Sequence, residues 1–233
     1  MKCIRRDRLL RKILAATGLA MALLAPMHPK AEPYTITPRE VALLPEYCKY
    51  SQAYQSLIPG GKDESKIKQW YEIMGGSYPP GMGMFHHMHH YCRGLQHRNY
   101  VKWFAKSKPE RDFHLGASIL EFNYVIDHAE QGFKLMPEFL TMKGESLIAL
   151  GKAPLAIVEL QRAMQLKPDY WPPYVALSDY YNDLGNPKMA REVLEQALSF
   201  SPNAQAVKRR LVELDGIKAK PGTAAKSVTE VVK

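Results

Sequence analysis

The sequence of 233 residues lacks the motifs that mark most catalytic and cofactor sites. It contains no Cys-x-x-Cys-His haem attachment, no Gly-x-Ser-x-Gly, no phosphate-binding loop and no His-Glu-x-x-His. It also has no run of alternating Val, Ile and Thr that would predict a β-sheet, and helix-forming residues dominate. These absences favour an all-α protein that is not an enzyme.

Net positive charge is confined to the two ends of the chain. The formal net charge is +9, but residues 1–31 carry +6 of it and residues 216–233 carry +3. The part between them is close to neutral, so it offers no basic surface on which a nucleic acid would bind. We therefore expect no nucleic-acid partner.

A hydrophobic run long enough for a comfortable membrane span is also missing. The apolar run at residues 13–25 follows a basic stretch, and its length is typical of the core of a secretory signal. Ala25 and Ala31 are small residues near which a signal peptidase could cut. We expect a signal peptide over residues 1–31 and a periplasmic or secreted protein. If the leader stays uncleaved, it would instead anchor the protein in the inner membrane.

Cysteine is rare, with three in the chain. Cys3 precedes the apolar run of the leader, so export would leave Cys48 and Cys92. An even number of cysteines in an exported chain predicts one disulfide between them. Two buried free thiols are the alternative.

The chain divides into regions of different regularity. Residues 32–108 are broken by prolines and glycine pairs, and they predict an irregular helical region with helices at 45–57, 64–74 and 84–105. Residues 109–215 predict a regular helical domain that opens with a helix at 109–128. Residues 216–233, rich in Lys, Ala, Ser and Thr, predict a disordered tail.

Two stretches of the regular domain match each other at an offset of 34 residues. The identical pairs are Leu150/Leu184, Gly151/Gly185, Ala156/Ala190, Leu160/Leu194, Ala163/Ala197 and Pro168/Pro202. A repeat of this length indicates stacked helix pairs that share one continuous core. Its helices are expected at 137–150, 154–166, 171–184, 187–200 and 204–214, because glycine or proline follows the periodic segments.

These positions resemble the tetratricopeptide repeat, which alternates large and small residues before Gly, Ala and Pro. The second repeat, 171–204, fills the pattern with Tyr174, Leu177, Ser178, Tyr181, Gly185, Ala190, Leu194, Ala197 and Pro202. The first repeat, 137–170, departs from it at Lys143, where the family has a large apolar residue. Residues 86–132 resemble a third, degenerate pair. The resemblance implies an α-solenoid of helix hairpins.

In this family the first helices of successive pairs line a concave groove that binds a peptide or another protein. Carried over by position, the lining residues are Glu138, Thr141, Glu145, Ile148, Pro172, Val175, Asp179, Asn182 and Arg209. This mixture of acids, amides and apolar groups would suit a segment with some basic character. The resemblance thus implies an adaptor or scaffold for a protein of a cell-envelope or export assembly. Solvated helix faces without a ligand are the alternative.

A segment rich in histidine and methionine precedes the repeats. It has four histidines within five residues, and imidazole binds Cu(II) or Zn, whereas thioether binds Cu(I). The candidate metal ligands are Met82, His86, His89 and His90. Met88 and Cys92 would lie on the apolar face of a helix here, where core packing is the alternative. A periplasmic copper or zinc protein is therefore the second functional hypothesis, although no other feature implies a cofactor.

Overall fold

The computed structural model describes residues 36–74 and 83–218, which are largely helical and contain no β-strand. This confirms the predicted all-α fold class. The described helices are α2 (Pro38–Ala42), α3 (Glu46–Lys49), α4 (Glu64–Ile73), α5 (Met84–Trp103), α6 (Lys108–His128), α7 (Met136–Ala149), α8 (Ala153–Leu166), α9 (Pro172–Asp183), α10 (Pro187–Phe200) and α11 (Gln205–Lys218). The predicted leader at 1–31 lies outside the described residues.

The helices of the repeats begin and end close to the residues that the sequence predicts. Each of α7, α8, α9 and α10 has a proline in its first turn, where the missing N–H costs no hydrogen bond. Gly151 and Gly185 follow α7 and α9 with φ angles of 77° and 73°, a left-handed conformation that glycine adopts without strain. The helix α11 continues to Lys218, beyond the predicted end at residue 214, and 219–233 lie outside the described residues.

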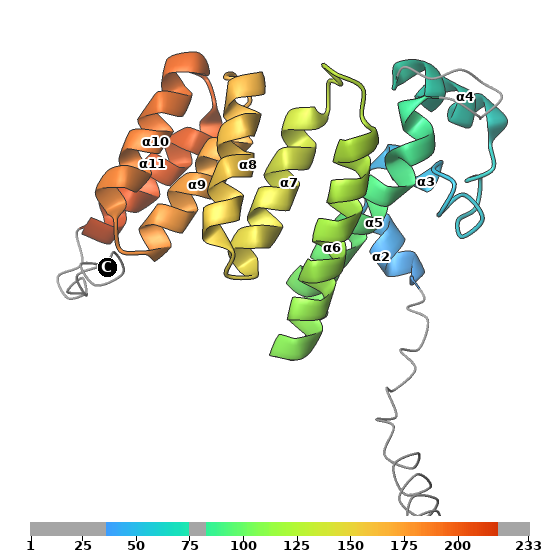
Figure 1. Cartoon of the computed structure of the whole chain (residues 1–233), viewed down its shortest axis with the longest axis horizontal. Helices are drawn as coiled ribbons and strands as arrows, with labels where there is room; N and C mark the ends of the chain where they lie inside the picture. The colour runs from blue at the N-terminus through green and yellow to red at the C-terminus, as the bar shows by residue number, and fades with distance from the viewer. Residues whose placement is uncertain (1–35, 75–82, 219–233) are drawn as a thin grey trace, which may run out of the picture. The chain divides into compact units, whose positions relative to one another are not determined.

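Helices α7 to α11 pack against one another in chain order (Figure 1). Among α7 to α11, the pairs α7–α8 and α9–α10 have the most extensive contacts, and α8 and α9 join one pair to the next. At the crossing of α7 and α8, a Cβ on Gly144 would lie 2.8 Å from the side chain of Leu160, so a larger residue would require that side chain to shift. The buried residues Leu160, Leu177 and Leu194 belong to one core that runs through both repeats. This arrangement confirms the predicted helical solenoid.

Lys143, which departs from the family pattern, has a partner in the next helix. Its Nζ lies 2.6 Å from a carboxylate oxygen of Glu159, and both side chains are less than one-fifth exposed. A half-buried ion pair between α7 and α8 thus replaces the apolar contact that the repeat normally makes at this position.

The degenerate pair expected at 86–132 consists of α5 and α6, which pack extensively along their length. Gly94 lies against the ring of Phe122, and a Cβ there would come within 2.3 Å of Cε1. The predicted boundary between residues 108 and 109 lies at the start of α6. The core around α5 and α6 also includes Phe139 and Leu140 of α7.

The helix predicted at 45–57 is wrong. In the structure α3 ends at Lys49, and residues 50–62 form consecutive turns. The hydroxyl of Ser51 donates a hydrogen bond to the carbonyl of Cys48 at 2.8 Å, and the N–H of Ser51 bonds the same carbonyl. Such local bonds compete with the i to i−4 pattern of an α-helix, so the helix ends after one turn.

A short helix that the sequence analysis missed, α2, precedes this segment. Its cap is Thr37, whose hydroxyl accepts a hydrogen bond from the N–H of Glu40, while the carboxylate of Glu40 accepts one from the N–H of Thr37. This reciprocal pair is a capping box, and Pro38 occupies the first position of the helix.

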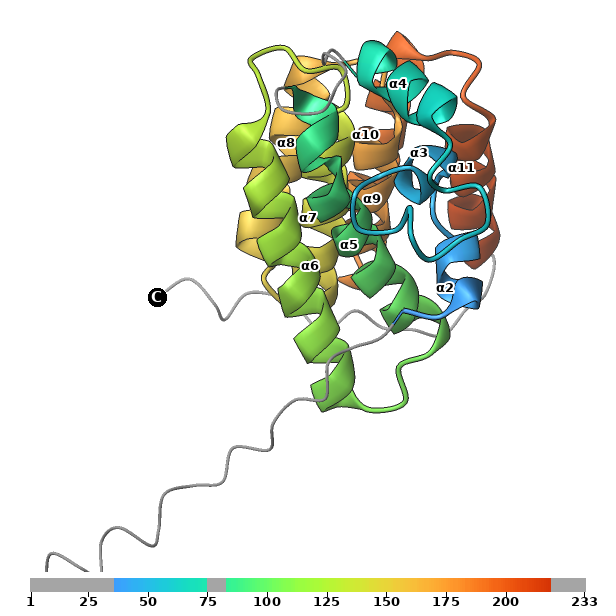
Figure 2. The same cartoon turned by 90° about the vertical axis from the view of Figure 1, so that its right-hand side faces the viewer.

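Cys48 and Cys92 form the predicted disulfide, with their Cα atoms 5.6 Å apart and both side chains fully buried. The bond joins α3 to the middle of α5. Helices α2, α3 and α4 all contact α5, and Figure 2 shows them beside it. None of the helices within 36–74 and 83–218 is long and apolar enough to cross a membrane.

Candidate functional site

Eight of the nine groove residues predicted from the sequence fall on the first helices of the two repeats, α7 and α9, and Arg209 falls on α11. Four of them, Glu145, Ile148, Val175 and Asp179, line one pocket of about 430 Å³. The spacing explains why, since residues three and four apart lie on one face of a helix. The structure therefore brings these four residues together between α7 and α9, which also contact each other directly.

The other α7 positions of the predicted set are not open. Thr141 is fully buried, and its hydroxyl donates to the carbonyl of Pro137 at 2.7 Å. Glu138 accepts a hydrogen bond of 2.5 Å from the hydroxyl of Tyr91, a buried residue of α5. Thr141 is thus a packing residue, which contradicts its assignment to the groove surface, and Glu138 is bound to the helix next to it.

Side chains of α3 and α5 lie against the Glu138 end of the groove. Tyr47 of α3 lies near this carboxylate, and burial together with the charge of Glu138 raises the pKa of the Tyr47 phenol. Burial raises the pKa of Tyr170 too, with Glu138 and Glu145 as further causes. Arg98 of α5 then donates to the carbonyl of Met142 at 2.6 Å and pairs with Glu145. The groove is therefore covered from Glu138 up to Glu145 and opens beyond it.

At the C-terminal end of the groove the structure uses Arg210 rather than the predicted Arg209. Arg210 donates to the carboxylate of Asp179 at 2.9 Å and to that of Glu213 at 2.6 Å. Arg209 and Arg210 are both exposed and neither lines the pocket, but only Arg210 pairs with Asp179, a residue of its lining. One residue turns the direction of a side chain by about 100° on a helix, so a shift of one position moves it off the face.

The same one-residue difference occurs at Asn182, because the pocket is lined by its neighbour Asp183. Pro172 is half-buried in the first turn of α9, away from the pocket lining. Sequence reasoning missed four lining residues, namely Ala149, Ala176, Tyr180 and Asp183. Each directly follows a predicted residue, so a wider stripe on each helix would have included them.

The pocket is acidic around an apolar centre. Ile148, Val175 and Ala176 supply the apolar surface, whereas Glu145, Asp179 and Asp183 supply carboxylates. Burial raises the pKa of Asp179, and Asp183 and Glu213 raise it further, although Arg210 acts in the opposite direction. Burial is the largest cause, and Arg210 outweighs the two neighbouring carboxylates, so the raised pKa reflects the loss of water around Asp179 more than repulsion from Asp183 and Glu213.

The histidine–methionine segment forms the first half of α5. His89 donates from Nδ1 to the carbonyl of His86 at 2.7 Å, and Nδ1 of His90 lies 2.5 Å from a carboxylate oxygen of Glu121. Burial lowers the pKa of His89 to about 4. Met82 lies outside the described residues. Met88 and Cys92 are fully buried, as the packing alternative predicts.

No three His, Cys, Asp or Glu side chains within 36–74 and 83–218 are placed to hold a metal ion. The ring of His90 is stacked on Tyr124, with centroids 3.6 Å apart, and His87 and His128 have centroids 4.8 Å apart. These imidazoles pack along the seam between α5 and α6. The metal hypothesis remains a prediction that this arrangement does not favour.

Comparison with known proteins identifies the repeat. A family model of the tetratricopeptide repeat matches residues 172–204, which contain α9, α10 and the turn after them. A search of curated proteins finds no match to the chain. Repeats of this family stack into surfaces that bind other proteins or peptides. Residues 172–204 of this chain therefore contain a tetratricopeptide repeat.

Proposed function

We propose that this protein is a non-enzymatic adaptor that is exported to the bacterial periplasm and binds a segment of a partner protein between α7 and α9. The observation that carries the proposal is the open pocket of about 430 Å³ on the first helices of the two repeats. The basic stretch and apolar run of residues 1–25 support export. The partner belongs to a cell-envelope or export assembly.

The chemistry of the pocket defines the partner segment. Ile148 and Val175 would contact one or two apolar side chains, because an apolar surface gains stability when it is removed from water. Asp179 and Asp183 would bind a lysine or arginine next to them, since both carboxylates line the pocket and charge-assisted hydrogen bonds are the strong ones. A segment with basic and apolar residues in alternation or on one helix face therefore fits.

Site-specific photocrosslinking in cells tests this assignment. A photoreactive residue at Val175 should give one discrete adduct, and the same residue at Val158 should not. Val158 is the matched control because it lies on α8 outside the pocket and is 61% exposed. Mass spectrometry of the adduct should locate the contact in a basic and apolar segment of one envelope protein.

A synthetic peptide of the crosslinked segment then tests the electrostatics. The charge reversal Asp183→Lys should weaken its binding by about tenfold, and added salt should weaken the wild-type complex, because exposed charges are screened. The control Glu192→Lys changes an exposed acid on α10 and should leave affinity unchanged. Equal affinity of Asp183→Lys and wild type, or a crosslinked segment without basic residues, would refute the groove as the binding site.

The mass of the mature protein tests the location. A cleaved leader would remove the residues up to Ala25 or Ala31 and release the protein into the periplasmic fraction. An intact leader together with sedimentation in the membrane fraction would instead support the membrane-anchored assembly factor. Retention of the full-length chain in the cytoplasm would contradict both forms of the export proposal.

A further inference from the structure

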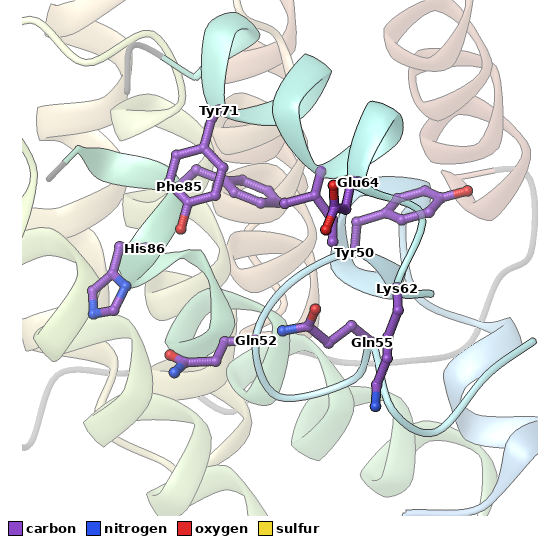
Figure 3. A pocket seen from close by; sticks show the side chains of 9 residues that line it. Tyr50, Gln52, Gln55, Lys62, Glu64, Tyr71, Phe85 and His86 are labelled. Carbon is purple, nitrogen blue, oxygen red and sulfur yellow. The ribbon is translucent and has the colours of Figure 1, made fainter. Parts of the chain in front are cut away.

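A second pocket lies at the other end of the described chain, where the turns after α3, the beginning of α4 and the first turn of α5 meet (Figure 3). Its volume is about 400 Å³, within the range of small-molecule sites. It shares no lining residue with the groove between α7 and α9. Neither the repeat family nor the proposed adaptor function assigns a role to it.

The floor of this pocket is apolar and aromatic. Tyr71 and Phe85 are 5% and 3% exposed, and their rings meet edge to face with centroids 4.8 Å apart. Ile67, half-buried on α4, adds an aliphatic surface. Such a floor would accept the aliphatic or aromatic part of a ligand, because the rings are already packed and lose no freedom when it binds.

The mouth of the pocket is polar. In Figure 3 the polar ends of Gln52, Gln55 and Glu64 are arranged around the same space, with Lys62 at its edge. Among the described residues, neither Lys62 nor Glu64 takes part in a salt bridge. By contrast, Asp63 between them caps α4 and accepts hydrogen bonds from the N–H groups of Ser65 and Lys66. One unpaired charge of each sign is therefore left at the mouth.

The walls are held in place before any ligand binds. The disulfide of Cys48 fixes the chain two residues before Tyr50, which lines one wall. Gly61 is buried, and a Cβ there would lie 2.4 Å from the carbonyl oxygen of Gln55, so the two ends of this turn are in contact. A preformed cavity reduces the entropy that a ligand must lose together with the protein.

We propose that this pocket binds a free α-amino acid with an apolar side chain. The side chain would enter the aromatic floor formed by Tyr71 and Phe85. The α-ammonium group would pair with the carboxylate of Glu64, and the α-carboxylate with Lys62, whose exposed and flexible stem can bring the ammonium across the mouth. The amides of Gln52 and Gln55 can donate to the carboxylate and accept from the ammonium.

Calorimetric titration of the full chain with L-phenylalanine and L-leucine tests the proposal. At least one of them should bind. Phenylalanine amide lacks the carboxylate and N-acetyl-phenylalanine lacks the ammonium, so each should bind at least about tenfold more weakly than L-phenylalanine if that amino acid binds. The corresponding leucine derivatives serve if L-leucine is the ligand. Equal binding of the three forms would overturn the assignment of a zwitterion.

Two substitutions at the mouth locate the site. Glu64→Gln and Lys62→Met should each reduce affinity by about tenfold, because each removes one charged hydrogen bond. Both residues are exposed, so folding should be unaffected, and circular dichroism would check this. Glu72→Gln and Lys66→Met are matched controls on α4 that lie outside the pocket lining and should bind as the wild type does.

Binding of neither amino acid at millimolar concentration, or unchanged affinity in both mouth variants, would overturn the proposal. The crosslinking experiment at Val175 tests the groove without any amino-acid titration, and the two pockets share no lining residue. Failure of one proposal would therefore leave the other to be judged on its own experiment.

Discussion

The repeats α7–α11 and the N-terminal segment α2–α4 are stabilised in different ways. The repeats rely on contacts between helices that are near each other in sequence, with small residues such as Gly144 and Ala156 at the crossings. The N-terminal segment has short helices and consecutive turns, and it depends on α5, which lies beyond it in the chain. The comparison teaches that periodic packing supports the groove, whereas a covalent bond supports the pocket at the other end.

Removal of the disulfide should have the largest effect on stability, and it should affect the N-terminal segment more than the repeats. Cys48→Ser together with Cys92→Ser should lower the free energy of unfolding by about 4 kcal/mol, because the bond closes a loop with a sequence separation of 44. Hydrogen exchange followed by mass spectrometry should show faster exchange in α3, α4 and the turns between them. The helices α9 and α10 should keep their protection from exchange. Equal loss of protection in all helices would contradict the view that the two regions are stabilised independently.

A substitution at the α5–α6 crossing should have the next largest effect. Gly94→Ala would place a Cβ 2.3 Å from the ring of Phe122, which is fully buried and rigid, so we expect a destabilisation of about 2 kcal/mol. Gly144→Ala is the matched change in the repeats, where the overlap is smaller, with an aliphatic side chain, Leu160, at 2.8 Å. Its cost should be less than about 1 kcal/mol, since alanine also favours the helix.

Denaturant unfolding of the two variants beside the wild type measures the difference. The double variant Gly94→Ala and Phe122→Leu should recover part of the loss, because the smaller side chain removes the steric overlap. If Gly144→Ala destabilises the protein as much as Gly94→Ala does, the α5–α6 pair is no more tightly constrained than the repeats.

The sequence predicts the repeats well because their information is local. The prolines in the first turns of α7 to α10, and Gly151 and Gly185 after α7 and α9, define boundaries without reference to the rest of the molecule. The short helix α2 can also be predicted from the sequence, since Thr37 and Glu40 have the spacing of a capping box. Pro38 does not interrupt the chain there, because it occupies the first turn of α2.

The remaining errors have tertiary causes. The hydrogen bond between Tyr91 and Glu138 joins residues 47 positions apart, and no local pattern shows that Glu138 is covered. Likewise the pairing of Arg98 with Glu145 depends on how α5 approaches α7. The choice of Arg209 over Arg210 reflects the register of α11 against α9, which only packing determines.

Acid should weaken the α5–α6 pair more than the repeats, because all the described histidines lie on these two helices. Nδ1 of His97 lies 2.8 Å from Nδ1 of His114, so the two nitrogens share one proton and cannot both be protonated. Burial, with a smaller contribution from His114, lowers the pKa of His97 to about 4, and burial also lowers that of His114.

The sign of the pH effect follows from these shifts. The unfolded chain has histidine pKa values near 6.5, so it binds more protons than the folded protein below that pH. Stability is therefore complete above about pH 6.5 and decreases as the pH falls towards about 4. We expect a loss of about 1 kcal/mol from the His97–His114 pair, after discounting for partial exposure.

Denaturant unfolding as a function of pH checks this loss. His97→Gln should flatten the decrease between these pH values, because the glutamine does not titrate. His128→Gln is the control, since His128 is an exposed residue on the same helix pair. The same pH dependence in His97→Gln and in the wild type would show that the pair does not contribute.

The smallest effect concerns the one position where the first repeat departs from its family. Lys143→Leu alone should cost about 1 kcal/mol, because it leaves Glu159 half-buried without its partner. The double variant Lys143→Leu and Glu159→Leu should lie within about 0.5 kcal/mol of the wild type, since a well-packed apolar pair can replace a half-buried ion pair. The matched change on α10, Lys188→Leu with Glu192→Leu, removes an exposed pair and should also be close to neutral.

Thermal and denaturant unfolding of the three variants measure these differences. A double variant much less stable than Lys143→Leu would mean that the ion pair, rather than an apolar contact, is required where α7 crosses α8.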